Sequence, residues 1–325
     1  MTAAVPLAVV ERSGLVESVH LGHLLVRSAS GDVLALGEVD EPMWPRSAVK
    51  PIQAVAMLRA GLRIGQDRLA LAASSHEGTA LHLDLVRGVL AEAGLDEADL
   101  QNTPDLPLGQ DAAFAWRAAG HGPSSLTQNC SGKHAAMLAT CVLAGWDTRT
   151  YRDPEHPLQR VIRRTLEDLT GVPVSQVGVD GCGAPLFSTT LRGLARAFSR
   201  IATAGPGTHE HTVARAVATH PHLVGGPHRD VSAILAAVPG LVAKDGAEGV
   251  FAAALPDGSA LALKVADGSG RPVRAVVAEA LARLLPAEHH APLREMGRTV
   301  VLGHGEAVGA VRALLPAPPV EVVTR

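Results

Sequence analysis

Aromatic residues are the scarcest class in this 325-residue chain, where four Phe, three Trp and one Tyr make up 2% of the residues. Proteins that bind single-stranded nucleic acid use such rings to stack on bases, and most nucleic-acid-binding domains present a basic surface. The formal net charge of this chain is −3. We therefore predict that nucleic acid is not a partner, and that Ala, Leu and Val build the core.

The chain also contains few cysteines and no long apolar segment. The three cysteines, Cys130, Cys141 and Cys182, are too few for a disulfide framework and suit a reducing compartment. No apolar run reaches the ~18 residues of a membrane helix. Residues 1–10 lack the basic residues that open a signal peptide. We expect a cytoplasmic protein that does not use a membrane as a partner.

Strand-like segments are found at both ends of the chain. Residues 15–27 and 32–39 are rich in Val and Leu and flank a turn signal, which predicts a hairpin. Residues 249–255 and 259–265 flank Pro256-Asp-Gly258 and predict a second hairpin. We expect residues 316–325 to be a strand or a tail.

The middle of the chain is mainly helical. Apolar residues at helical spacing predict helices at residues 52–61, 82–93, 133–144, 158–169, 212–219, 231–237 and 273–285. Strands at both ends with helices between them predict an α+β sandwich in which the terminal strands share one sheet. We expect a single catalytic domain over residues 1–325. Its sheet part spans about residues 1–46 and 225–325, and its mainly helical part about 47–224.

The first candidate for chemistry is the segment Arg46-Ser-Ala-Val-Lys-Pro51. Proline is favoured in the first turn of a helix, so a helix should begin close to Lys50 and bring Ser47 and Lys50 to one face. A lysine can act as the base for a serine nucleophile when burial or a nearby cation lowers its pKa. The alternative is that Ser47 is an ordinary helix N-cap.

Four other short segments carry polar residues beside apolar runs. They are Ser75-His76, Asn129-Cys-Ser-Gly-Lys-His134, Asp180-Gly-Cys182 and Lys244-Asp-Gly246. Loops that follow buried segments often carry function, but each of these has a purely structural alternative. Cys130 and Cys182 could supply two of the three or four ligands that zinc needs, or they could be inert buried thiols.

Taken in chain order, these segments resemble the Rhizobium etli-type L-asparaginases, the thermolabile type II family. The resemblance runs from about residue 8 to about residue 285 and also includes Glu11-Arg-Ser-Gly-Leu-Val-Glu-Ser-Val-His20. It implies a serine β-lactamase and penicillin-binding-protein-like fold, a homodimer, and hydrolysis of L-asparagine to L-aspartate and ammonia. The chain departs from the family pattern after Gly226, where Pro-His-Arg-Asp stands in place of a Cys-Thr pair.

The resemblance also implies roles for individual residues. Its two serine–lysine pairs correspond to Ser47 with Lys50 and to Ser75 with Lys244. Its zinc ligands correspond to Cys130, Lys133 and Cys182, with a positioning or structural role for the metal. We predict that substrate is bound by residues of the same segments, namely Arg46, His76, Asn129, His134 and Asp180.

We expect Ser47 to attack the carboxamide carbon while Lys50 takes its proton. Lys244 would stabilise the oxyanion, and Asp180 would meet the α-ammonium group of the substrate. The sequence leaves three alternatives open: a glutaminase, another hydrolase of the β-lactamase-like type, and a non-catalytic sensor on the same scaffold.

Overall fold

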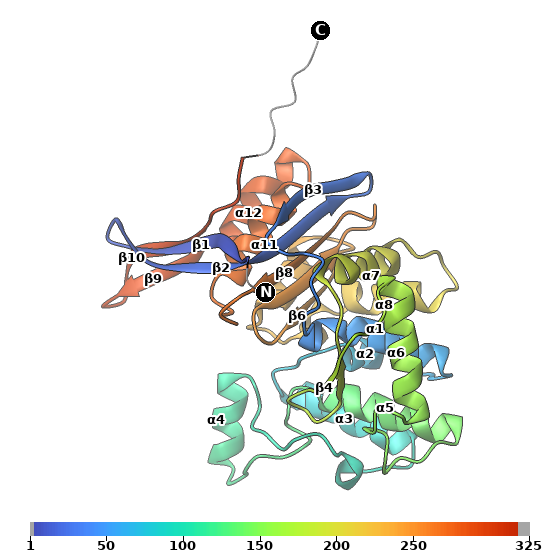
Figure 1. Ribbon diagram of the computed structural model, residues 1–325. Helices are drawn as coiled ribbons and strands as arrows, with labels where there is room; N and C mark the ends of the chain where they lie inside the picture. The colour runs from blue at the N-terminus through green and yellow to red at the C-terminus, as the bar shows by residue number, and fades with distance from the viewer. Residues whose placement is uncertain (1–2, 318–325) are drawn as a thin grey trace.

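The computed structural model describes residues 3–317, in which strands from both ends of the chain form one antiparallel sheet (Figure 1). The strands are β1 (Val5–Arg12), β2 (Leu15–Ser28), β3 (Gly31–Leu36), β4 (Val177–Val179), β5 (Pro185–Phe187), β6 (Val242–Gly246), β7 (Val250–Ala254), β8 (Ala260–Val265), β9 (Thr299–Gly303) and β10 (Glu306–Ala313). The eight-stranded sheet has the order β6-β7-β8-β2-β1-β10-β9, with β3 paired to β2. The strands β4 and β5 pair separately.

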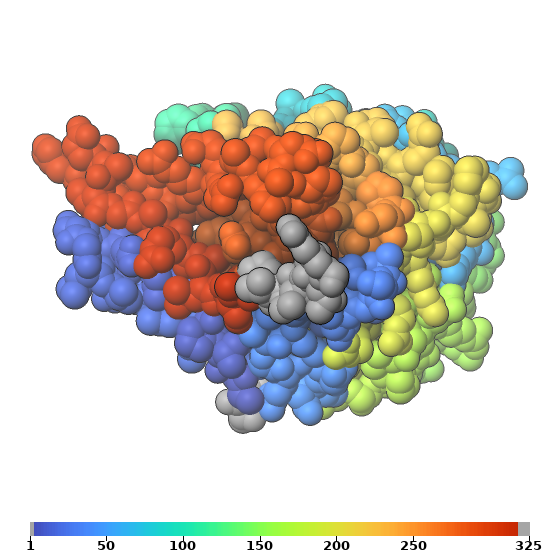
Figure 2. Space-filling model, turned by 90° about the horizontal axis from the view of Figure 1, so that it is seen from above, coloured from blue at the N-terminus to red at the C-terminus, as the bar shows by residue number. Residues whose placement is uncertain are grey.

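The two ends of the chain meet at β1. This strand pairs with β2 on one side, through Val9 and Val19, and with β10 on the other, through Val9 and Arg312. Figure 2 shows the N-terminal segment in blue beside the C-terminal segment in red. The predicted α+β architecture, with terminal strands in one sheet and helices inserted between them, is confirmed. The predicted hairpins β2–β3 and β7–β8 are also confirmed.

Helices fill the middle of the chain. They are α1 (Lys50–Arg59), α2 (Gln66–Ala72), α3 (Ala80–Glu92), α4 (Gln110–Ala118), α5 (Ser131–Ala144), α6 (Pro157–Thr170), α7 (Leu191–Thr203), α8 (His209–Thr219), α9 (Pro221–Val224), α10 (Asp230–Ala237), α11 (Val273–Ala282) and α12 (His290–Gly297). Three short 3₁₀ helices are η1 (Arg46–Val49), η2 (Glu97–Asp99) and η3 (Ala287–His289). All seven predicted helices are present. Among residues 3–317, no helix has both the length and the apolar character needed to cross a bilayer.

Helices cover the sheet from two sides. Figure 1 shows α11 and α12 above the sheet, and α1, α7 and α8 below it. The helix α11 packs against β1, β7, β8 and β10, while α7 packs against β2, β6, β7 and β8. The sheet is therefore buried between two helical layers over these strands, which explains why β7 is apolar throughout and β8 is apolar except for Lys264, instead of alternating.

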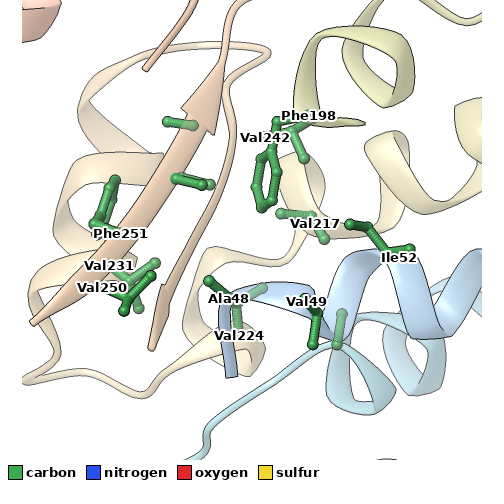
Figure 3. Close-up of a cluster of buried hydrophobic side chains, with 14 of the residues drawn as sticks. Ala48, Val49, Ile52, Phe198, Val217, Val224, Val231, Val242, Val250 and Phe251 are labelled. Atoms are coloured by element: carbon green, nitrogen blue, oxygen red, sulfur yellow. The ribbon is translucent and has the colours of Figure 1, made fainter. Parts of the chain in front are cut away.

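A cluster of buried side chains joins the sheet to the helical part (Figure 3). Its labelled members come from β6, β7, η1, α1 and the helices α7 to α10: Ala48, Val49, Ile52, Phe198, Val217, Val224, Val231, Val242, Val250 and Phe251. Ala48 and Val49, in η1 directly before the start of α1, are buried in this cluster. Packing of aliphatic side chains thus fixes the η1 turn against β6, and Ser47 with it.

Some elements were not expected from the sequence. The hairpin β9–β10 supplies one edge of the sheet, although its sequence shows no clean alternation of apolar and polar residues. The short pair β4–β5 also lies within a stretch predicted to be helical. Of the predicted terminal strand or tail at 316–325, residues 316 and 317 belong to no helix or strand, and residues 318–325 lie outside the described part of the chain.

Candidate active site

Ser47 lies on a strained turn at the start of α1. Arg46 has a φ of 50°, a left-handed conformation that residues other than glycine rarely adopt and that is concentrated at functional sites. The backbone of β6 comes so close that a Cβ atom on Gly246 would lie 2.8 Å from the Pro45 carbonyl oxygen. The Ser47 side chain is partly exposed, and its hydroxyl has no hydrogen-bond partner among residues 3–317. This hydroxyl is therefore free to meet a ligand.

Lys50 begins α1, as predicted, and is 1% exposed. It adopts helical angles, φ −58° and ψ −37°, although a following proline disfavours them. Its Nζ donates to the Ser75 Oγ at 3.0 Å and to the Ser74 carbonyl oxygen. The structure therefore joins Lys50 with Ser75, whereas the resemblance implied the pairs Ser47–Lys50 and Ser75–Lys244.

Ser75 comes from the loop after α2. Its N–H donates to the Val224 carbonyl oxygen at 2.9 Å, and the next two residues also make backbone contacts with neighbouring loops. The loop is thereby held between the start of α5 and the segment after α9, and its serine points to the Lys50 amine. Ser74, which we did not single out, is fully buried and supplies a second acceptor for Lys50.

Lys244 lies on β6 with no exposed surface. Its Nζ donates to the carboxylate and to the backbone carbonyl oxygen of Asp245. Burial lowers the pKa of Lys244 to about 8; the Asp245 carboxylate opposes this shift, and the positive charges of Lys50 and Arg229 add to it. A group with this pKa changes its charge within the pH range in which enzymes work.

Asp245 connects Lys244 to a further cation. Its second carboxylate oxygen accepts a hydrogen bond from Arg229 Nη2 at 2.6 Å. Burial raises the pKa of Asp245, but the charges of Lys244 and Arg229 outweigh burial and hold the pKa well below its usual range. Roles for Asp245 and Arg229 were not predicted from the sequence, although the position of Asp245 directly after Lys244 was a usable signal.

A second cluster contains the three residues that the resemblance assigns to zinc. Cys130, Lys133 and Cys182 are all at least 97% buried, and Lys133 Nζ donates to Cys182 Sγ at 3.1 Å. The hydrogen bond from Cys130 lowers the pKa of Cys182 to about 5, and the same bond and burial raise the pKa of Cys130 to about 12. Burial lowers the pKa of Lys133, but the nearby sulfurs and Asp180 outweigh it, so the net shift is upward. The cluster is thus an ammonium–thiolate pair.

The donor atoms of this cluster fit zinc in type and proximity, because two sulfurs and one amine converge in a buried space. Among residues 3–317, no group of three or more His, Cys, Asp and Glu side chains could hold a metal, so the third protein ligand would have to be Lys133. A metal would also have to displace protons from Lys133 and Cys130, since both have raised pKa values.

Arg46 links the second cluster to the Ser47 turn. Its Nε donates to Asp180 Oδ1 at 2.7 Å, and Asp180 Oδ2 lies 3.6 Å from Cys182 Sγ. Burial raises the pKa of Asp180, but the charges of Lys133 and Arg46 dominate and lower it. Asp180 is therefore a carboxylate whose first partner is Arg46. A cavity of about 250 Å³ lies beside Arg46 and is also lined by Trp44, Glu248 and Lys264.

The two candidate histidines are neutral parts of the surrounding core. His76 Nε2 lies 2.9 Å from Ser131 Oγ, and His134 Nδ1 lies 2.6 Å from the hydroxyl of Tyr151. Burial, followed by nearby positive groups, lowers the pKa of each histidine well below its usual value. Each ring keeps one buried nitrogen without a partner among residues 3–317. Tyr151, the only tyrosine of the chain, was not identified from the sequence.

Asn129 lies between these groups. Its side-chain oxygen accepts from Cys130 Sγ at 3.1 Å, and its carbonyl oxygen accepts from the His76 N–H at 3.2 Å. The predicted residues therefore form two connected groups. In the first, Lys50 contacts Ser75 and acts electrostatically on Lys244, and Ser47 precedes Lys50 by one turn. The second contains Cys130, Lys133, Cys182 and Asp180, and Arg46, Asn129, His76 and His134 contact or neighbour these residues.

Comparison with known families matches nearly the whole chain to one family. The sequence model of the family described as L-asparaginase II matches residues 8–313. A comparison with curated proteins gave no match.

Several solved structures are remotely similar. A β-lactamase from Mycobacterium bovis has 15% identity and a TM-score of 0.42, covering 85% of this chain and 95% of its own. The hydrolase EstCE1, described as having promiscuous acyltransferase activity, has 12% identity and a TM-score of 0.42, covering 80% and 93%. A probable glutaminase from Bacillus subtilis has 14% identity and a TM-score of 0.35, covering 76% and 79%. Similarities at this level do not identify a substrate.

Proposed function

We propose, from the premise that this chain belongs to the L-asparaginase II family, that it hydrolyses the side-chain amide of L-asparagine to L-aspartate and ammonia. Amide hydrolysis through a covalent intermediate needs a nucleophile, a base and a donor for the oxyanion. One observation carries the proposal above all. The buried amine of Lys50 lies one helical turn after the free hydroxyl of Ser47 and contacts a second serine, Ser75.

In the first step, the Ser47 Oγ attacks the carboxamide carbon, and the Lys50 amine takes the hydroxyl proton. The proton then passes to the nitrogen of the amide. Ammonia departs, and the substrate remains bound to Ser47 as an aspartyl ester. Water hydrolyses this ester, again with Lys50 as the base, and restores the serine hydroxyl. The contact between Lys50 and Ser75 supports a role for Ser75 in relaying the proton or holding this water.

Lys244 supplies positive charge near the reacting carbonyl. The charge of Lys50 contributes to the lowered pKa of Lys244, so the two amines act on each other electrostatically. With a pKa of about 8, Lys244 is mainly protonated at pH 7 and can stabilise the oxyanion. Asp245 keeps it charged in spite of its burial.

The ends of a free amino acid need oppositely charged partners. Arg46 is the candidate for the α-carboxylate and Asp180 for the α-ammonium group, because they lie side by side next to Ser47. Arg46 and Asp180 would each bind one end of the substrate while they keep their ion pair with each other. The cavity of about 250 Å³ beside Arg46 is the candidate route to these groups.

Zinc is proposed as a cofactor held by Cys130, Lys133 and Cys182. When bound, zinc would supply a fixed positive charge that helps to orient the substrate. The residues themselves perform the steps above. Metal analysis of the purified protein should find one zinc per chain, and replacing both cysteines by serine should remove it. A wild-type protein without bound zinc after growth in zinc-supplied medium would contradict this part.

The nucleophile is tested with two matched variants. Ser47→Ala should reduce ammonia release from asparagine by at least about 10⁴-fold, because the nucleophile is lost. Ser75→Ala should reduce it by about 10²-fold, because only proton relay is impaired. If Ser47→Ala keeps more than a few percent of the wild-type rate while Ser75→Ala is inactive, Ser75 is the nucleophile.

The substrate is tested by measuring ammonia release from asparagine and from glutamine, beside hydrolysis of the β-lactam nitrocefin. We expect turnover of asparagine to dominate. A preference for glutamine would make the protein a glutaminase, and no turnover of any of the three would favour a sensor. A homodimer and a cytoplasmic location also stay proposals; a sedimentation measurement giving a monomer would contradict the first.

A further inference from the structure

A second cavity, of about 570 Å³, lies beside β6 and contains none of the serines or lysines of the candidate active site. It is lined by the end of β6, the start of β7, the segment before α10, the first turn of α11 and the start of β9. We call it the arginine cavity, because Arg229, Arg271, Arg274 and Arg298 all line it. Its volume lies in the range of small-molecule sites.

The charges of the lining are unbalanced. Four arginines face only two acidic residues, Asp230 and Asp245. Asp245 is shared between Arg229 and Lys244, and Asp230 lies 3.5 Å from an Nη atom of Arg274. The cavity thus has an excess of positive charge even with the neighbouring His228 neutral.

Three of the arginines have spare donors. Arg229 uses Nη2 on Asp245, but its buried Nε has no partner among residues 3–317. The exposed side chain of Arg271 has no hydrogen-bond or ion-pair partner in the described part of the chain. Arg298 has only a 3.9 Å contact with Glu295, and both side chains are exposed, so this pair is weak. Guanidinium groups with free donors favour carboxylate and phosphate ligands.

The start of α11 adds to the positive potential. Its first turn includes Val273 and Arg274, which line the cavity, and it has no acidic residue and no side-chain cap. The Val273 N–H donates to the Gly270 carbonyl oxygen, so the contribution of this helix end is the positive end of its dipole. A Cβ atom on Gly270, just before α11, would meet nothing within 4 Å, so space is open there.

The remaining surface is partly apolar. Val300, which is 39% exposed, contributes to the lining together with the arginines, and the buried side chains of Val250 and Phe251 lie behind it. A bare inorganic ion would leave this volume and the apolar wall unused. The combination suits a small organic molecule with anionic groups at the arginines and a carbon body against the apolar wall.

We propose that the arginine cavity binds a small organic anion with phosphate or carboxylate groups, and that its charge is transmitted to Lys244 through Arg229 and Asp245. The route consists of two hydrogen bonds, from Arg229 to Asp245 and from Lys244 to Asp245. An anion on Arg229 offsets the positive charge that contributes to the lowered pKa of Lys244. Lys244 would then stay protonated to higher pH.

Binding is tested directly on the full chain without substrate, so its outcome is separate from that of the proposed asparaginase activity. Isothermal titration calorimetry with glycerol phosphate and with citrate should give saturable binding of at least one probe. A response to glycerol phosphate alone assigns a phosphate ligand, and a response to citrate alone assigns carboxylates. Binding of both probes shows that the site recognises negative charge and does not distinguish phosphate from carboxylate. If neither probe binds saturably to the wild type, the proposal is wrong.

Variants locate the binding. Arg271→Gln should weaken binding several-fold, and the Arg271→Gln/Arg274→Gln double variant at least tenfold. Arg117→Gln is the matched control, because Arg117 is also exposed and unpaired among residues 3–317 but lies on α4. Equal affinity in all four proteins would place binding elsewhere and overturn the proposal. The single variant keeps the test valid if the double variant does not fold, since the Arg271 side chain makes no hydrogen bond or ion pair among residues 3–317.

The coupling has its own measurement. In wild type, a saturating probe should move the alkaline limb of the pH–activity profile upward. The same concentration should have no such effect in Arg229→Gln, where the link to Asp245 is missing. An unmoved limb in wild type with the cavity occupied would overturn the coupling to Lys244.

Discussion

Lys244 and Lys133 are both completely buried lysines, yet their surroundings shift their pKa values in opposite directions. Burial disfavours the charged form of each. Lys244 has one carboxylate partner and two cations nearby, so its pKa falls to about 8. Lys133 has two sulfurs and a carboxylate, so its pKa rises. Burial alone therefore does not make a lysine reactive; the balance of neighbouring charges decides whether it can take part in proton chemistry or remains a fixed cation.

The comparison divides the site into a reactive part, with Lys50 and Lys244, and a charge-paired part, with Lys133 and Cys182. Lysine substitutions in the reactive part should mainly cost activity, and substitution of Lys133 should mainly cost stability.

The largest effect is expected for Lys50. Lys50→Met removes the base and should lower kcat/KM for asparagine by about 10⁴-fold. Lys50→Arg should be nearly as inactive, because arginine keeps the charge but does not give up a proton near neutral pH. Circular dichroism would check that both variants fold. An active Lys50→Arg enzyme would rule out Lys50 as the base.

In the zinc-free protein, Lys133→Met should lower the free energy of unfolding by about 3–5 kcal/mol, because the Cys182 thiolate would lose its buried ammonium partner. Urea unfolding at neutral pH measures this change. The thiolate absorbance of Cys182 should also appear at higher pH than in wild type, since Lys133 contributes to its lowered pKa. A variant as stable as wild type, with an unchanged thiol titration, would contradict the ion pair.

Lys244→Met is the counterpart on the other side of the comparison. Asp245 keeps Arg229 as a partner, so the variant should unfold within about 1 kcal/mol of wild type. Its kcat should fall by about 10²–10³-fold through loss of oxyanion stabilisation. A Lys244→Met variant that is strongly destabilised, but whose folded molecules keep the wild-type kcat, would contradict the division into a reactive part and a charge-paired part.

The smallest effects concern the pH dependence of the reactive part. Stabilisation of the oxyanion by Lys244 requires the protonated form, so activity should fall as the pH rises through about 8. Asp245 raises the pKa of Lys244 and Arg229 lowers it. Asp245→Asn should thus move the falling limb to lower pH, and Arg229→Gln should move it to higher pH, each by about one unit. Steady-state rates at saturating asparagine measure both shifts, and movement in the same direction would refute this electrostatic account.

Much of the fold could be predicted from local pattern. Pro51 marks the start of α1, and the turn at Pro256 to Gly258 marks the hairpin β7–β8. The hairpin β9–β10 was missed because its burial pattern is irregular, so that pairing with β1 rather than sequence alternation defines it. Local pattern predicts elements well where one face is buried and the other is exposed.

The sequence identified which residues to consider for the site, but it did not predict which of them contact one another. The ordered motifs identified Ser47, Lys50, Ser75 and Lys244. Of these, Lys50 contacts Ser75 and acts electrostatically on Lys244, and Ser47 lies one turn before Lys50. They did not predict that Lys50 would contact Ser75, because that contact depends on how the loop after α2 is held by distant backbone. The role of Arg229 depends on a contact with β6 that no local pattern could indicate.

The central claim, that Ser47 and not Ser75 forms the covalent bond to substrate, is open to one direct measurement. The wild-type enzyme is incubated with a diazo-ketone analogue of asparagine and digested, and the modified peptide is sequenced by mass spectrometry. The label is expected on Ser47 and should be absent when unlabelled L-aspartate saturates the site. A label on Ser75 instead would contradict the account.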